Sequence, residues 1–292
     1  MKAFLEPLQE LQGFQEMADT LEKERGVITV SGGTEAQKPH MIYAMDNGLK
    51  NKIIVTFHEQ RAKELYEDYI FFDPDAVYYP AKDVLFYQSD IRGNLLTAER
   101  INALKAIHEK KQVTLITTFD ALMNTMAPPQ NMWDSVLTIH SGDILDLKKI
   151  TAQLVRMGYE KEYQVETMGQ FALRGGILDI FPLTEENPVR IEMWGDEVDT
   201  LRSFDTESQR SIELMEELTV YPACELVLTE EQKNAGIDKI RKEAQKAAEQ
   251  LRKDMKTEEA YRTPSLVDEL AEEWGELSKC TGMHAFLSDF CG

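Results

Sequence analysis

Apolar and polar positions follow two different periods along residues 1–140. Short apolar runs typical of β-strands occur at residues 27–30, 52–57, 76–79, 113–118 and 135–139. Between them, residues 59–72 and 97–110 repeat apolar residues at three- and four-residue steps, as amphipathic helices do. The two helical faces contain Ala62, Leu65, Tyr66, Tyr69 and Ile70, and Ile101, Leu104 and Ile107. This alternation predicts an α/β domain whose mostly parallel sheet is covered by helices.

A different pattern begins near residue 141 and continues to residue 222. One amphipathic helical segment comes first, within residues 143–165. Strand-like runs follow, separated by turn signals at residues 174–176, 186–188 and 195–196. Strands joined by short polar turns, with one helix before them, predict a small antiparallel α+β unit over residues 141–222.

The remaining residues, 223–292, are predicted to be helical. One apolar stripe recurs at helical spacing on a highly charged segment and contains Ile237, Ile240, Ala244, Ala247, Leu251 and Met255. Packing of this stripe on its own protein is favoured over a free coiled coil. A chain of 292 residues is longer than one compact domain usually is, which agrees with a division into several segments.

The charge of the chain limits its partners. Lys and Arg number 32 and Asp and Glu 52, so the net charge is −20. Such a chain repels a phosphate backbone, which argues against nucleic-acid binding through a broad basic face. No apolar run approaches the roughly 18 residues of a membrane span. We therefore expect a soluble, cytoplasmic protein without a membrane partner.

Residues that carry catalytic or metal chemistry are scarce. The three cysteines are widely spaced and form no CxxC pair, which favours reduced thiols over a metal site. The five histidines are isolated from one another, and no Gly-x-Ser-x-Gly or His-Glu-x-x-His motif occurs. The sequence predicts no catalytic residue and no metal site, so this chain is not expected to be an enzyme by itself.

Residues 27–39 resemble a phosphate-binding loop that has lost its chemistry. Gly32 is followed by four residues and then by Gln37, Lys38 and Pro39, where the pattern requires glycine, lysine and serine or threonine. Gln37 adds a side chain where the pattern needs none, and Pro39 lacks the hydroxyl that ligates magnesium. Glu35 adds a negative charge where a triphosphate would lie. We predict that this degenerate loop is inactive and that the chain binds no cofactor.

The strand-like residues 189–194 carry a sharper signal. Their strict alternation places Arg190 and Trp194 on one face of the predicted strand, and Arg174 lies on a polar face at the end of another. Exposed Trp and Arg on a rigid sheet are the residue types that dominate binding hot spots. Alternatively, Trp194 only covers the sheet while both arginines pair with Asp179 or Glu192. The pattern leaves both interpretations open.

Several blocks of the sequence resemble the N-terminal region of the bacterial transcription-repair coupling factor family, Mfd. The blocks are the degenerate loop, residues 78–90, 99–107 and 114–129, and the continuous stretch 143–211. That region is similar to the excision-repair protein UvrB. The resemblance implies a helicase-like α/β domain with a degenerate Walker A loop at residues 1–140 and an inserted α+β domain at residues 141–222. Residues 223–292 would be the truncated helical return of the first domain.

The resemblance also implies a function. In the family, the second domain docks UvrA, and its contact residues match Arg174, Arg190 and Trp194, although phenylalanine is more common at the last position. The chain would thus be a non-catalytic module that recruits UvrA to nucleotide excision repair after removal of a stalled RNA polymerase. RNA polymerase and DNA would bind other parts of the full-length protein, an ATP-dependent DNA translocase. The alternatives are a UvrB-type ATP-dependent DNA-unwinding subunit and a structural domain that restrains the motor.

Overall fold

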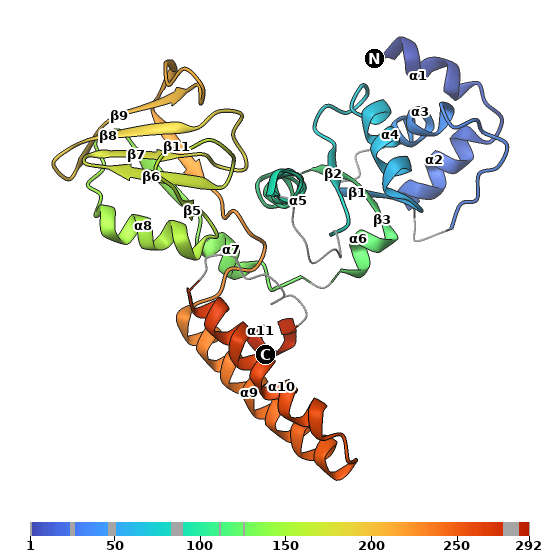
Figure 1. Cartoon of the computed structure of the whole chain (residues 1–292). Coiled ribbons are helices and arrows are strands. Elements are labelled where there is room, and N and C mark those ends of the chain that lie inside the picture. Colours follow the sequence, from blue (N-terminus) through green and yellow to red (C-terminus); the bar gives the residue numbers. More distant parts are fainter. Residues whose placement is uncertain are drawn as a thin grey trace. The chain divides into compact units, whose positions relative to one another are not determined.

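The computed structural model of the chain describes residues 2–23, 27–45, 51–82, 90–110, 112–124, 126–276 and 286–291. Its contacts divide the chain into two compact units, each shown in Figure 1. Unit 1 comprises Met1–Asp83 and Asn102–Asn124, and unit 2 comprises Val84–Ile101 and Thr125–Gly292. The three segment boundaries expected from the sequence remain predictions.

Unit 1 contains a three-stranded parallel sheet with the strand order β1–β3–β2. The strands are β1 (Asn51–Thr56), β2 (Val77–Tyr79) and β3 (Val113–Thr118). Every residue of the central strand β3 is buried, as expected for a strand covered on both faces. The α/β class with a parallel sheet, predicted from the alternation of strands and helices, is confirmed for this unit.

Helix α4 (Glu59–Tyr69) packs against all three strands of this sheet. Its buried side chains Ala62, Leu65 and Tyr69 share a core with Ile116 of β3, as the helical periodicity predicts. The other helices of unit 1 are α1 (Lys2–Gln9), α2 (Phe14–Lys23), α3 (Gln37–Ala44) and α6 (Phe119–Met123). Helix α5 (Asp90–Glu109) contributes its later residues to unit 1 and its earlier ones to unit 2.

Three details predicted for the residues of unit 1 are wrong. Ile70, expected on the buried face of its helix, is 36% exposed because α4 ends at Tyr69. Residues 27–30 form no strand, and Val27 is 96% exposed. An apolar run becomes a strand only when a neighbouring strand pairs with it, and no such ladder forms among the described residues. Ile107 was expected on the buried face of its helix but is 48% exposed. It lies six residues after the buried Ile101, about 120° around the helix at 3.6 residues per turn.

Unit 2 contains a six-stranded sheet with the order β10–β9–β8–β7–β6–β5. The strands are β5 (Glu160–Lys161), β6 (Gln170–Arg174), β7 (Ile177–Ile180), β8 (Val189–Trp194), β9 (Glu197–Phe204) and β10 (Ser211–Met215). All pairs are antiparallel except β5–β6. The antiparallel unit predicted from the turn signals is therefore confirmed, with one short parallel pair at its edge.

Two further strands of unit 2 form a separate antiparallel pair, β4 (Leu137–His140) with β11 (Glu217–Val220). The sequence pattern assigned the apolar run at residues 135–139 to the parallel sheet, and this assignment is wrong. Its partner comes from a strand almost eighty positions later in the chain. Pairing over such a separation is not visible in the local alternation of residues.

The core of unit 2 lies against one face of the six-stranded sheet, which we call the inner face. Ile150 and Leu154 of helix α8 (Leu147–Arg156) pack there with Phe171, Leu178 and other buried side chains. Asp146 caps α8 by accepting hydrogen bonds from the backbone N–H groups of Lys148 and Lys149, which stabilises the start of the helix. The opposite, outer face of the sheet carries the candidate site.

The end of unit 2 is helical, as predicted. It contains α9 (Glu230–Lys253), α10 (Thr257–Glu276) and α11 (Leu287–Cys291), which lie side by side in Figure 1. Unit 2 also contains the shorter helix α7 (Gln130–Asp134), which precedes its strands. A capping box of Thr229 and Gln232 starts α9. Ile237, Ile240, Ala244 and Ala248 form its buried face.

The predicted apolar stripe on α9 is therefore only partly correct. Ala247 is exposed because the neighbouring Ala248 occupies the buried position. Met255 is 89% exposed because α9 ends at Lys253 and Met255 has a positive φ beyond it. Among the residues that the structure describes, no helix combines the length and the apolar character that crossing a membrane requires.

Candidate functional site

The degenerate phosphate loop leads into helix α3, which begins at Gln37. Gly32 has a φ of +84°, a conformation that favours glycine, and Gln37 Oε1 accepts a hydrogen bond from the backbone N–H of Thr34 at 2.9 Å. The Gln37 side chain thus bonds an N–H group within the loop itself. Pro39 is buried in the first turn of α3, where its missing N–H costs little.

The charges of this loop pair with one another. Glu35 forms ion pairs with Lys38 of the same loop and with Arg61 of α4. The hydrogen bond from Lys38, and next the positive charge of Arg61, lower the pKa of the Glu35 carboxyl. Lys38 and Arg61 are therefore both paired with a carboxylate of the chain itself.

The outer face of the six-stranded sheet brings Arg174 and Arg190 together. Arg174 ends β6, Arg190 lies on β8, and Asp179 lies on the strand between them, β7. Asp179 is the direct register partner of Arg190. Side chains opposite one another in an antiparallel pair stand on the same face of the sheet. The sequence alone could not supply this register.

Asp179 holds both arginines. Its Oδ2 accepts a hydrogen bond from Arg174 Nη2 at 2.6 Å and one from Arg190 Nη2 at 2.8 Å, and its Oδ1 accepts one from Arg190 Nε at 2.7 Å. Only 1% of the Asp179 side chain is exposed, against 32% of Arg174 and 16% of Arg190. The pairing anticipated as the structural alternative is present, and both guanidinium groups still reach the surface in part.

Arg190 has further contacts that fix its orientation. Its Nη2 donates to Gln209 Oε1 at 2.9 Å, and its guanidinium carbon lies 4.4 Å from the centre of the buried Phe204 ring. Hydrogen bonding to Asp179 raises the pKa of Arg190, so the group stays charged. Such a guanidinium is held in place before any partner arrives, which reduces the entropy lost on binding.

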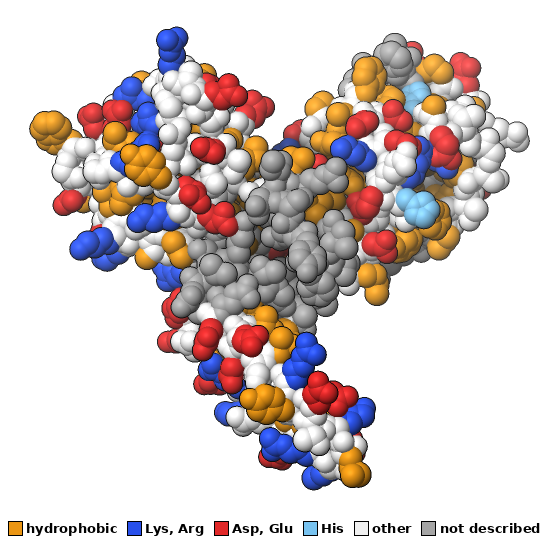
Figure 2. All heavy atoms as spheres, in the orientation of Figure 1, with side chains coloured by type: hydrophobic (Ala, Val, Ile, Leu, Met, Phe, Trp, Pro, Cys, Tyr) orange, Lys and Arg blue, Asp and Glu red, His pale blue; other side chains and the backbone are white. Residues whose placement is uncertain are grey.

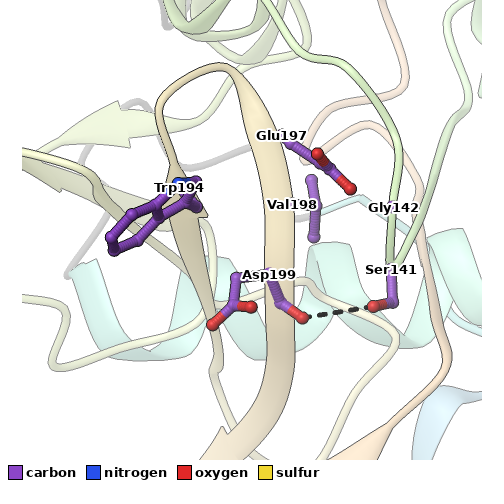
Figure 3. A pocket seen from close by; sticks show the side chains of 6 residues that line it. All are labelled: Ser141, Gly142, Trp194, Glu197, Val198 and Asp199. Carbon is purple, nitrogen blue, oxygen red and sulfur yellow. Dashed lines mark hydrogen bonds between the residues drawn. The ribbon is translucent and has the colours of Figure 1, made fainter.

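Trp194 ends the same strand as Arg190 and is 82% exposed. A two-residue turn with Gly195 at a φ of +66° joins it to Glu197, its register partner on β9. Trp194 also borders an open hollow of about 380 Å³, which Figure 3 shows together with Ser141 and Asp199. Glu197 and Asp199 line this hollow, so it does not favour an anionic ligand.

Two further neighbours on this face, which the sequence pattern did not single out, are Arg202 of β9 and Leu214 of β10. Arg202 is the register partner of Arg190, and Leu214 is the register partner of Arg202. Figure 2 shows basic and apolar side chains next to one another over the sheet of unit 2. The alternation of residues 211–215 could have identified Leu214, but its place beside the arginines depends on the strand order.

Three arginines and two carboxylates meet on this outer face, because Arg202 also pairs with Glu192 at 3.1 Å. These five side chains carry three positive and two negative charges, whereas the chain as a whole carries a charge of −20. Within the described residues, no group of His, Cys, Asp or Glu side chains could hold a metal ion. The arrangement suits recognition of another molecule's carboxylates and apolar groups more than it suits bond-breaking chemistry.

Comparison with known proteins gives consistent matches. A family model described as the UvrB interaction domain matches residues 137–226, which include Arg174, Arg190 and Trp194. The transcription-repair-coupling factor of Staphylococcus aureus (strain USA300) is 34% identical over 207 residues, 69% of this chain and 18% of that protein. The transcription-repair-coupling factor of Bacillus subtilis (strain 168) is 30% identical over 219 residues, which are 74% of this chain and 18% of that protein. The transcription-repair-coupling factor of Staphylococcus haemolyticus (strain JCSC1435) is 33% identical over 223 residues, which are 75% of this chain and 19% of that protein.

The chain thus spans less than a fifth of the length of these relatives. The matched residues include all strands of unit 2, β4–β11, and the candidate site. The matches also agree with the resemblance of the sequence to the N-terminal region of these relatives. The chain belongs to the transcription-repair-coupling factor (Mfd) family.

Proposed function

We propose that this chain recruits UvrA, and that Arg174, Arg190 and Trp194 on the outer face form the contact. The observation that carries the proposal is that the exposed Trp194 lies on the same strand as Arg190, one of two arginines held by Asp179, within residues that match a UvrB interaction domain. A tryptophan next to arginines on a rigid sheet has the composition of a binding hot spot. The partner surface would offer carboxylates to the guanidinium groups and an apolar pocket to the indole.

The proposed mechanism is surface complementarity between rigid surfaces. Asp179 fixes Arg174 and Arg190 before the partner binds, so little side-chain entropy is lost on association. Local positive charge on an acidic chain would favour one docking orientation over others. The sheet itself provides the rigid support, since its inner face is packed in the core of unit 2.

In the full-length protein, this recruitment would link a stalled RNA polymerase to nucleotide excision repair in the cytoplasm. RNA polymerase, DNA and ATP would bind parts outside the chain, which spans 18% of its relatives. The chain itself would catalyse no reaction, because Lys38 of the degenerate loop pairs with Glu35 and Pro39 stands where a magnesium-ligating hydroxyl is required. Helix α3 and its loop would then serve a structural purpose only.

A binding assay with purified UvrA tests the contact residues. The variants Arg174→Ala, Arg190→Ala and Trp194→Ala should each weaken binding by about 2 kcal/mol, the loss typical of a hot spot. Tyr261→Ala is a matched control, because Tyr261 is 77% exposed on α10, away from the sheet. If all three variants bind UvrA as tightly as the wild type, another surface makes the contact.

A titration with a fluorescent ATP analogue and magnesium tests the non-catalytic role. The wild-type chain should show no saturable binding at micromolar concentrations, because Pro39 occupies the position of the magnesium-ligating hydroxyl and Lys38 is paired with Glu35. Saturable binding that disappears in Lys38→Ala would instead support an ATP-dependent subunit of UvrB type.

A further inference from the structure

One row of side chains crosses the outer face of the sheet from its centre to its edge. Asp179 on β7 pairs in register with Arg190 on β8, Arg190 with Arg202 on β9, and Arg202 with Leu214 on β10. Directly opposed residues of antiparallel strands have their Cβ atoms about 4.5–5.5 Å apart on the same face. The row therefore continues the proposed UvrA contact by two strands, to the last strand of the sheet.

Leu214 is the apolar end of this row. Its neighbour Met215 packs against the core on the inner face, so strand alternation directs Leu214 to the outer face. Leu214 is 72% exposed. A single exposed leucine is ordinary, but this one lies in the same row as two arginines of the candidate site. It offers a second apolar contact, separate from Trp194.

Arg202 is incompletely bonded. Its Nη2 atom donates to Glu192 Oε2 and to Thr200 Oγ1, each at 3.1 Å. Its Nε atom is buried and has no hydrogen-bond partner among the described residues. A guanidinium group has five N–H donors, and because Nε is buried, a further carboxylate would bind Arg202 through its Nη N–H groups. Its side chain is 31% exposed, nearly as much as that of Arg174.

We propose that Arg202 and Leu214 extend the docking face to the edge strand β10 and contact the same partner, UvrA. This inference rests on the proposed function. Arg202 would pair with a carboxylate of the partner, and Leu214 would enter an apolar depression beside it. Two strand spacings, about 10 Å, separate β8 from β10. Trp194, the arginines and Leu214 thus fit within one standard interface of roughly 800 Å² per partner.

Continuity and charge support this single occupant. The row shares Arg190 with the proposed contact, so a partner that covers Arg190 and Trp194 lies against Arg202 as well. The row adds a cation and an apolar group, the same two chemical types that Arg190 and Trp194 provide. A second copy of this chain is disfavoured as the occupant by the net charge of −20 that each copy carries.

The experiment measures the dissociation constant of purified UvrA with the 292-residue chain and its variants. Leu214→Ala and Arg202→Ala should each weaken binding at least about fivefold, as contacts inside an interface do. Leu266→Ala is the matched control, because Leu266 is 53% exposed on α10. It should bind like the wild type. Thermal unfolding of each variant shows whether the fold is retained, and truncation of the exposed Leu214 should leave it unchanged.

The outcomes separate this inference from the proposed function. If Arg190→Ala and Trp194→Ala lose UvrA binding while Leu214→Ala and Arg202→Ala keep it, the contact ends at β8 and the extension is wrong. If all four variants bind normally, the outer face is not the UvrA contact and both proposals fail. Weaker binding of Arg202→Ala that Arg202→Lys partly restores would show that the positive charge, and not only the packing, contacts the partner.

Discussion

At the scale of single residues, the buried carboxylate of Asp179 holds Arg174 and Arg190 on the outer face. Asp179 is 1% exposed and accepts three hydrogen bonds from two arginines. The sequence identified Arg174, Arg190 and Asp179 as residues that could pair, because strand alternation fixes which side chains share a face. It could not decide which pairs form, because that depends on the order and register of β6, β7 and β8.

Replacement of Asp179 tests how far the fold depends on this network. Asp179→Ala leaves two guanidinium groups without their shared acceptor, so the free energy of unfolding should fall by about 2–3 kcal/mol. Urea denaturation monitored by circular dichroism measures this change. Asp199→Ala is the control, since Asp199 lies on β9 of the same sheet with an exposed side chain. Equal stability of the two variants would show that the network contributes little to the fold.

At the scale of elements, local periodicity predicted most helices and strands but not their partners. The buried face of α4 and the strands β3 and β8 follow directly from the spacing of apolar residues. The apolar run at residues 27–30 and the strand β4 show the limit of such patterns. Whether and with what a strand pairs is decided by segments far away in the sequence, as the pairing of β4 with β11 illustrates.

The packing of α11 on α9 depends on a glycine. A Cβ atom at Gly236 would lie 2.2 Å from Phe290 Cδ1, far closer than atoms can approach. Gly236→Ala should therefore displace Phe290 and lower the free energy of unfolding by about 1–3 kcal/mol. In the Phe290→Ala background the same substitution should be neutral or stabilise the protein by up to about 1 kcal/mol, because alanine favours a helix more than glycine.

Chemical denaturation of the four proteins in this double-mutant cycle gives the coupling energy between the two positions. The expected result is that the destabilisation caused by Gly236→Ala disappears or changes sign in the Phe290→Ala background. The same effect of Gly236→Ala in both backgrounds would show that Phe290 does not occupy this position in solution. This contact could not be predicted from local periodicity, because Gly236 and Phe290 are separated by the whole of α10.

At the scale of the whole molecule, the degenerate loop and the candidate binding face belong to different units. Unit 1 holds the parallel sheet and the loop in which Glu35 pairs with Lys38. Unit 2 holds the outer face with the three arginines, Trp194 and Leu214. The length of the chain predicted more than one unit, and the change of pattern near residue 141 marked the antiparallel region. Each unit consists of two separate chain segments. Which segments come together depends on tertiary contacts, and the local pattern of residues does not show these.

From this division we predict that a destabilising substitution in unit 1 leaves the proposed recruitment of UvrA unchanged. Leu65 is buried in the core of unit 1 with Ala62, Tyr69 and Ile116. Leu65→Ala should cost about 2–5 kcal/mol of local stability, through lost burial and the cavity left behind. Hydrogen exchange followed by mass spectrometry should then show faster exchange in β1, β3 and α4 and unchanged exchange in β6–β9. UvrA affinity should stay at the wild-type value.

The counterpart in unit 2 is Leu178→Ala, because Leu178 is fully buried in the core beneath the outer face. This substitution should speed exchange in β6–β9 and weaken UvrA binding, since the arginines and Trp194 need a rigid sheet to support them. The two leucine truncations remove the same atoms, so any difference between them reflects their positions. If Leu65→Ala weakened UvrA binding as much as Leu178→Ala, the two units would unfold together or share the contact, and recruitment would be a property of the whole chain and not of unit 2.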